Sequence, residues 1–128
     1  MITFHPENYR DEIDVRNAGF DPQRAEDPVF NPRHIKRPIY PELRISETNA
    51  TWFLDFLGHS KTAYLPPSQL GDFLVKINML ETGVSNLFKA QKQGSLQREY
   101  YRKLLEYLYQ LDIIVRTCLH FNTNLVWA

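Results

Sequence analysis

The stretch LQREYYRKLLEYLYQLDIIVRTC, residues 96–118, decides the fold of this 128-residue chain. Its apolar residues recur at spacings of three and four, which brings their side chains back to one side of a helix. The members of this stripe are Tyr101, Leu104, Leu108, Leu111, Val115 and Cys118. Ser95 stands immediately before the stretch, where serine commonly caps a helix. The sequence therefore predicts a long helix over residues 95–122.

A second helix with the same spacing precedes this one along the chain. Its stripe consists of Phe73, Ile77, Leu80, Val84 and Leu87. Ser68 follows a double proline and can cap this helix, and Gly94 provides a stop between the two helical segments. We therefore predict a helix over residues 68–92 that forms a long antiparallel helical hairpin with the helix over 95–122. The fold class is mainly α, with a small β element.

Residues 45–67 contain this small element, and two interpretations stay open for them. As strands joined by a loop at Gly58, they form a short β-hairpin whose shared face carries Trp52, Leu54 and Phe56. As a helix, they are capped by Ser46 and ended by Gly58. The short length and the β-branched and aromatic residues favour the β-hairpin. Because a lone hairpin is marginal in water, its aromatic face must pack on another part of the protein.

Residues 1–44 hold six of the eight prolines and show little apolar periodicity. Each proline removes a backbone donor and restricts the residue before it, so a long helix is excluded here. We predict an extended, Pro-rich N-terminal arm, attached to a single small domain over residues 45–128. Acidic residues prevail in the first part of the arm and basic residues follow them. The arm either lies along its own domain or docks on a partner, and its candidate anchors are Phe30 and Tyr40.

The composition is that of a folded chain and argues against several classes of protein. Hydrophobic residues make up 43% of the sequence, which is enough for a core without metal or disulfide cross-links. Fifteen basic and fifteen acidic residues cancel, so the net charge gives no argument for nucleic acid or membrane binding. The single cysteine, Cys118, falls on a helix stripe, which indicates a packing role in a reducing compartment. No signal peptide and no membrane-spanning run is visible, so we expect a cytoplasmic protein.

The helix over 95–122 is more apolar than packing on a single neighbour requires. A second stripe on it is made of Tyr100, Tyr107, Ile114 and Phe121. Trp127 adds another apolar residue close to the last position of the chain. This surface is covered by a second copy of the chain, by the N-terminal arm, or by aromatic residues of 45–67, namely Trp52, Phe53 and Phe56. We predict that the second stripe and Trp127 belong to a protein interface, together with Phe30 and Tyr40 of the arm.

Basic residues gather where the two predicted helices meet. The group consists of Lys89, Lys92, Arg98 and Arg102. Ser95 opens a helix there, and the free N–H groups of a helix start attract anions. Because Arg98 lies where the helix dipole disfavours a cation, a bound anion would relieve it. This tip is therefore an alternative site for a phosphate-bearing ligand, a nucleotide or nucleic acid, with further cations from the arm at Arg33, Lys36 and Arg37.

No catalytic, cofactor or metal-binding motif stands out. The four histidines are far apart in sequence, and no glycine-rich phosphate loop occurs. The carboxylates of the C-terminal half mostly fit exposed helix faces, and they are Asp72, Glu81, Glu99, Glu106 and Asp112. We therefore predict a non-enzymatic accessory or adaptor subunit that needs no cofactor and associates with itself or docks in a larger complex. A homo-oligomer is expected, and nucleic acid is the less favoured partner.

Overall fold

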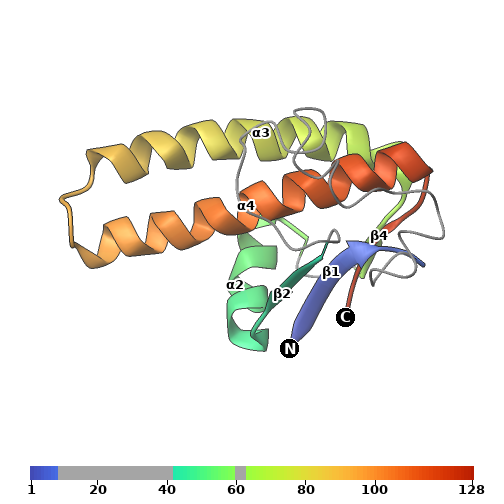
Figure 1. Cartoon of the computed structure of the whole chain (residues 1–128), viewed down its shortest axis with the longest axis horizontal. Helices are drawn as coiled ribbons and strands as arrows, with labels where there is room; N and C mark the ends of the chain where they lie inside the picture. Colours follow the sequence, from blue (N-terminus) through green and yellow to red (C-terminus); the bar gives the residue numbers. More distant parts are fainter. Residues whose placement is uncertain (9–41, 60–62) are drawn as a thin grey trace, which may run out of the picture.

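The structure, a computed structural model, describes residues 1–8, 42–59 and 63–128 (Figure 1). Within these residues it contains three helices and a small antiparallel sheet, which confirms a mainly α fold with a β element. In chain order the elements are β1 (Ile2–Pro6), β2 (Leu43–Ile45), α2 (Glu47–Leu57), β3 (Tyr64–Leu65), α3 (Pro67–Ala90), α4 (Leu96–Phe121) and β4 (Leu125–Trp127).

The two long helices, α3 and α4, lie side by side and run antiparallel along the length of the molecule (Figure 1). α3 begins at Pro67, because the fixed φ of proline suits the first position of a helix. α4 begins after Ser95, whose Oγ accepts a hydrogen bond from the Arg98 N–H at 3.2 Å. These bounds lie close to the predicted helices over 68–92 and 95–122.

The buried side of α3 differs from the predicted stripe near its C-terminal end. The buried residues of this helix are Leu70, Phe73, Ile77, Glu81 and Val84. The sequence assigns Leu87 to this side, but its side chain is 47% exposed, whereas Phe88 packs partly buried against the core. A step of four from Val84 leads to Phe88, so the buried row continues through that residue. Leu87 is thereby turned towards solvent.

The β-hairpin predicted within 45–67 is wrong, because residues 47–57 form the helix α2. Ser46 Oγ accepts a hydrogen bond from the Asn49 N–H at 3.2 Å and caps the first turn. Gly58 ends the helix with φ +80°, a left-handed conformation that glycine adopts without strain. The residues of α2 that the core buries follow helical spacing, and they are Ala50, Phe53 and Leu57. This spacing outweighs the β-propensity of the individual aromatic residues.

The sheet is built from strands that lie far apart in the sequence, in the order β2-β1-β4-β3. The first strand, β1, therefore occupies a central position, with Phe4 opposite Leu43 on one side and Trp127 on the other. Residues 2–6, predicted as part of the extended arm, thus belong to the folded sheet. The remainder of that stretch, residues 9–41, lies outside the described residues, and with it the predicted anchors Phe30 and Tyr40.

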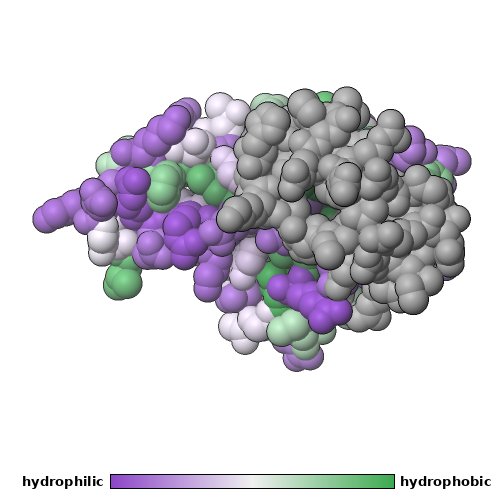
Figure 2. Space-filling view, viewed as in Figure 1, coloured by the Kyte–Doolittle hydropathy of each residue, from purple (hydrophilic) through white to green (hydrophobic). Residues whose placement is uncertain are grey.

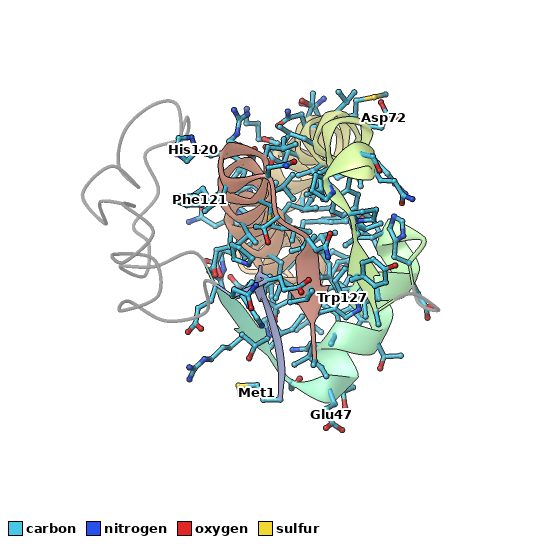
Figure 3. All side chains as sticks on the ribbon, turned by 90° about the vertical axis from the view of Figure 1, so that its right-hand side faces the viewer. Met1, Glu47, Asp72, His120, Phe121 and Trp127 are labelled. Atoms are coloured by element: carbon cyan, nitrogen blue, oxygen red, sulfur yellow. The ribbon has the colours of Figure 1, made fainter. Side chains whose placement is uncertain are left out.

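The core lies between the sheet and the helices. α4 rests on β1, β2 and β4, whereas α3 packs mainly on α4 (Figures 1 and 3). Phe4 is fully buried at the centre, with its ring 5.6 Å from the ring of Trp127 and 6.1 Å from that of Phe53. One side of β1, β2 and β4 thus meets α4, and α3 forms an outer layer of the molecule.

The turn between α4 and β4 is tied to the residue that follows β1. Asn122 ends α4 with φ +51°, a left-handed conformation that asparagine tolerates. Glu7 receives three contacts from this turn: its backbone N–H donates to the carbonyl of Asn124 at 2.9 Å, its carbonyl accepts from Thr123 Oγ1 at 3.1 Å, and its carboxylate accepts from Asn124 Nδ2 at 2.8 Å. The end of β1 is therefore held firmly against the start of β4.

Candidate functional site

The predicted interface on α4 is largely covered by other parts of the same chain. Tyr107 packs against Phe53 and Trp52 of α2, with ring centroids 5.4 and 5.9 Å apart. Ile114 is buried, and Trp127 is buried within the sheet. Tyr100 contacts Trp52 at 5.6 Å but keeps about half of its surface exposed, and Phe121 is half-buried beside His120. The aromatic residues of α2 thus cover much of the second apolar stripe of α4. This is the intramolecular alternative considered above.

The basic tip of the helix pair places Arg98 in a role that the sequence did not reveal. Its guanidinium Nη1 donates to the carbonyl of Phe88 at 3.2 Å and to that of Gln91 at 3.3 Å. The guanidinium also lies over the Phe88 ring, 4.0 Å from its centroid. Arg98 lies in the first turn of α4. Its side chain caps the C-terminal end of α3, where the helix dipole favours a cation. Its charge is therefore stabilised inside the chain and needs no bound anion.

Replacing Arg98 with alanine is expected to lower the free energy of unfolding by about 1–2 kcal/mol, since charged hydrogen bonds and a cation–π contact are lost. Urea unfolding followed by circular dichroism measures this change. Arg102→Ala is the matched control, because the partners of Arg102 are exposed and a change below about 0.5 kcal/mol is expected. Equal losses for the two variants would contradict the capping role of Arg98.

The other cations of the tip do not converge on a common point. Arg102 pairs with Glu99 at 2.9 Å and with Glu106 at 2.6 Å, and its hydrogen bond holds the pKa of Glu99 below its usual range. Figure 2 shows that this end of the molecule is mainly hydrophilic on the face drawn. Lys89 and Lys92 are exposed there, whereas Arg33, Lys36 and Arg37 lie outside the described residues. At the tip, Arg98 and Arg102 are thus paired within the chain, whereas Lys89 and Lys92 are exposed.

Two acidic residues of the long helices are buried, contrary to the expectation that their helix faces are exposed. Glu81 is buried on α3, and Asp112 is buried on α4. Asp112 Oδ1 accepts a hydrogen bond from Arg116 Nε at 2.5 Å, within an ion pair one turn apart on the same helix. This pairing offsets part of the cost of burying the Asp112 charge, whereas Asp112 Oδ2 is buried without a hydrogen-bond partner among the described residues.

A hollow of about 300 Å³ opens between the end of α2 and the start of α3. Its lining includes His59, Ser68, Asp72, Phe73 and Lys76. Burial, with a smaller effect from the Lys76 charge, lowers the pKa of His59 below 6.5. Lys76 Nζ donates to the carbonyl of Leu57 and so caps α2.

An exposed apolar surface lies on the side of α3 that faces away from α4. Val75 is 60% exposed and Met79 is 71% exposed, and a shallow hollow lies against both. We call this surface the outer face of α3 and define it by Gly71, Asp72, Val75, Met79, Thr82, Gly83, Asn86 and Leu87, all of which are exposed. Within the described residues no element packs on it closely enough to cover these side chains.

The outer face also carries few charges. Between Lys76 and Lys89 the one charged residue is Glu81, which is buried on the opposite side of the helix. Most solvent-exposed helices carry charged residues in every turn or two, whereas the centres of protein interfaces are depleted of them. A helix side that is exposed, apolar and uncharged over three turns is typical of a docking surface.

Sequence reasoning missed this surface because it placed Leu87 in the core and looked for surplus apolar residues on the other helix. A usable signal was present in the sequence. The stretch from Ile77 to Phe88 has a single charged residue, and α3 contains two glycines, Gly71 and Gly83, although glycine weakens a helix. A Cβ atom added at either glycine would meet nothing within 4 Å, so neither glycine is required by packing within the chain.

Three further findings concern membrane spans, metal sites and similarity to known proteins. None of the helices in residues 1–8, 42–59 and 63–128 combines the length and the hydrophobicity needed to cross a membrane. In the same ranges no three side chains of histidine, cysteine, aspartate or glutamate come together as a candidate metal site. Comparison of the chain with protein-family models, with curated proteins and with solved structures finds no match.

Proposed function

We propose that this protein is an interaction module, an accessory subunit that docks on another protein surface or on its own copy through the outer face of α3. The observation that carries the proposal is the exposure of Val75 and Met79 on the outer face of α3, which has no exposed charged residue between Lys76 and Lys89. Removing such side chains from water stabilises an association by roughly 1.5–3 kcal/mol each. Methionine also adapts its shape to a partner more easily than branched residues do.

The rest of the architecture supports this assignment, because it leaves the outer face as a rigid platform. α3 is a 24-residue helix whose opposite side is anchored on α4. Its N-terminal half is further held by Lys76, which donates to the end of α2. A docking surface on a preformed helix loses little conformational entropy when it binds. The outer face therefore presents its apolar side chains without having to fold first.

The test is a comparison of the full-length chain with the variant Val75→Glu/Met79→Glu. Both residues are exposed, so the fold is expected to persist, and circular dichroism and the melting temperature verify this. Self-association is measured by sedimentation velocity, and association with cellular proteins by quantitative pull-down from the native cells. We expect the variant to bind at least about tenfold more weakly, because two charges enter the centre of the interface.

Leu96→Glu is the matched control, since Leu96 is the most exposed of the large apolar residues and lies at the tip rather than on the outer face. A protein recovered from the cells supports the proposal only if the double variant loses it and Leu96→Glu retains it. Unchanged association of the double variant in both measurements would overturn the outer face as the docking surface.

A further inference from the structure

We infer that the outer face of α3 binds the same face of a second copy of the chain, with the two α3 helices antiparallel around a two-fold axis. This inference rests on the proposed function and names the occupant of the surface. It requires the face to be complementary to itself, because a two-fold interface uses the same residues on both sides. Both the charges and the shape of the outer face can be examined for this property.

The charges at the two ends of the outer face meet the requirement. Asp72 and Lys89 lie equally far along the helix on either side of the midpoint between Met79 and Thr82. An antiparallel second copy centred on that midpoint brings Asp72 of each copy level with Lys89 of the other. A parallel copy would instead place aspartate beside aspartate and lysine beside lysine, which repel. The charge pattern therefore selects the antiparallel arrangement.

These two charges are available for such contacts. Among residues 1–8, 42–59 and 63–128, neither Asp72 nor Lys89 takes part in an ion pair. Asp72 projects from α3 on the side away from Trp127 and the sheet (Figure 3). The remaining cation of that end, Lys76, donates to the carbonyl of Leu57 and is directed towards α2. The flanking charges of the outer face are thus one acid and one base.

The shape of the outer face is complementary at its centre. In the antiparallel arrangement Met79 of each copy lies at the level of Thr82 of the other, beside Gly83. Because a Cβ at Gly83 would meet nothing within its own chain, the space above this glycine is open to the long Met79 side chain of the second copy. Glycine also lets two helix backbones approach closely, which explains its presence in the middle of α3 despite its poor helix propensity.

A contact made by one helix from each copy is small, so the dimer is expected to be weak. Interfaces at the low end of the size range are commonly transient. We therefore expect a dissociation constant on the order of micromolar, and an equilibrium that shifts with protein concentration between about 1 and 300 µM. Sedimentation velocity of the full-length chain over this range measures the constant.

Gly83→Ala tests the central contact. The added methyl group fills the space that Met79 of the second copy occupies, so dimerisation is expected to weaken at least about tenfold. The same substitution should raise the melting temperature of the monomer, because alanine is the better helix former. Gly71→Ala is the matched control at the end of the face, where the two helices have diverged, and a change of less than about twofold is expected. Equal effects on dimerisation would contradict the central contact.

Charge reversal tests the antiparallel pairing. Asp72→Lys and Lys89→Asp each place like charges together at both ends of the dimer, and each should weaken it about tenfold. The double variant Asp72→Lys/Lys89→Asp restores opposite charges and should recover dimerisation to within about threefold. A double variant weaker than either single one would overturn the antiparallel arrangement.

The proposed function and this inference fail in different ways. If the wild-type chain stays monomeric up to about 300 µM, the second copy is excluded as the occupant. If a cellular protein is then lost with Val75→Glu/Met79→Glu and retained with Leu96→Glu, the outer face remains a docking surface and its occupant is a different protein. If neither association is seen, both proposals are overturned.

Discussion

Replacing Phe4 with alanine is expected to lower the free energy of unfolding by about 3–5 kcal/mol, the loss that follows when a fully buried aromatic ring is removed from a core. Phe4 is 1% exposed, and its ring contacts those of Phe53 in α2 and Trp127 in β4. The substitution therefore leaves a cavity between the sheet and α2. Because a typical domain is stable by only 5–15 kcal/mol, this single change removes much of the margin. Urea unfolding followed by circular dichroism gives the value.

An exposed residue three positions before Phe4 provides the control for this measurement. Met1→Ala changes a residue that is 73% exposed, so a loss below about 0.5 kcal/mol is expected. A loss below about 1 kcal/mol for Phe4→Ala would mean that residues 2–6 are not held in the sheet, as an extended arm would require. The comparison therefore decides whether β1 belongs to the folded domain.

Cys118 is expected to react with alkylating reagents roughly a thousandfold more slowly in the native protein than in the unfolded chain. The thiolate is the reactive form of cysteine, and burial raises the pKa of Cys118 from the ordinary 9.0 to about 12. At pH 8 the ionised fraction therefore falls by about three powers of ten. Iodoacetamide labelling followed by mass spectrometry, with and without guanidinium chloride, measures the two rates.

A second cysteine provides the internal comparison. In Leu96→Cys the new thiol stands at a position that is 86% exposed, so it should react at the rate of a free thiol while Cys118 stays unlabelled. The raised pKa also fixes the sign of a pH effect: the contribution of Cys118 to stability is complete below pH 9 and is lost as the pH rises towards 12. Rapid native labelling of Cys118 would show that α4 is not packed on the sheet as described.

The long helices could be located from the sequence because their signals are local. The stripe from Tyr101 to Cys118 and the cap at Ser95 are patterns of residues a few positions apart. The hydrogen bonds and side-chain contacts of a helix also join residues a few positions apart, so the sequence pattern indicates the helix directly. The sheet could not be located in this way. β1 has alternating apolar residues, Ile2 and Phe4, but its partners lie far along the chain, at residues 43–45 and 125–127. The apolar pattern of a five-residue strand is too short to predict pairing with strands so distant in the sequence.

The candidate site was predicted less well than the fold, for reasons that particular residues illustrate. Arg98 was interpreted from its own helix alone, although the cap it provides belongs to α3. Tyr107 belongs to a surplus apolar stripe in the sequence prediction, because that prediction favours a β-hairpin where the structure has α2, the helix that covers Tyr107. Met79 received no attention because an exposed apolar residue becomes visible only when burial is known. Function on a surface depends on what remains uncovered, and the sequence does not state that directly.

The order of the strands has a consequence for synthesis of the protein on the ribosome. β1 is made first, but one of its two neighbours in the sheet is β4, and the hydrogen bond between Asn124 and Glu7 joins residues 117 positions apart. The helix pair can assemble from adjacent segments as it emerges, whereas Phe4 has no Trp127 to pack against until residues 125–127 have been added. Until then the nascent chain carries an exposed apolar strand, which makes it a substrate for chaperones, and translation that stops before β4 leaves that strand permanently open to aggregation.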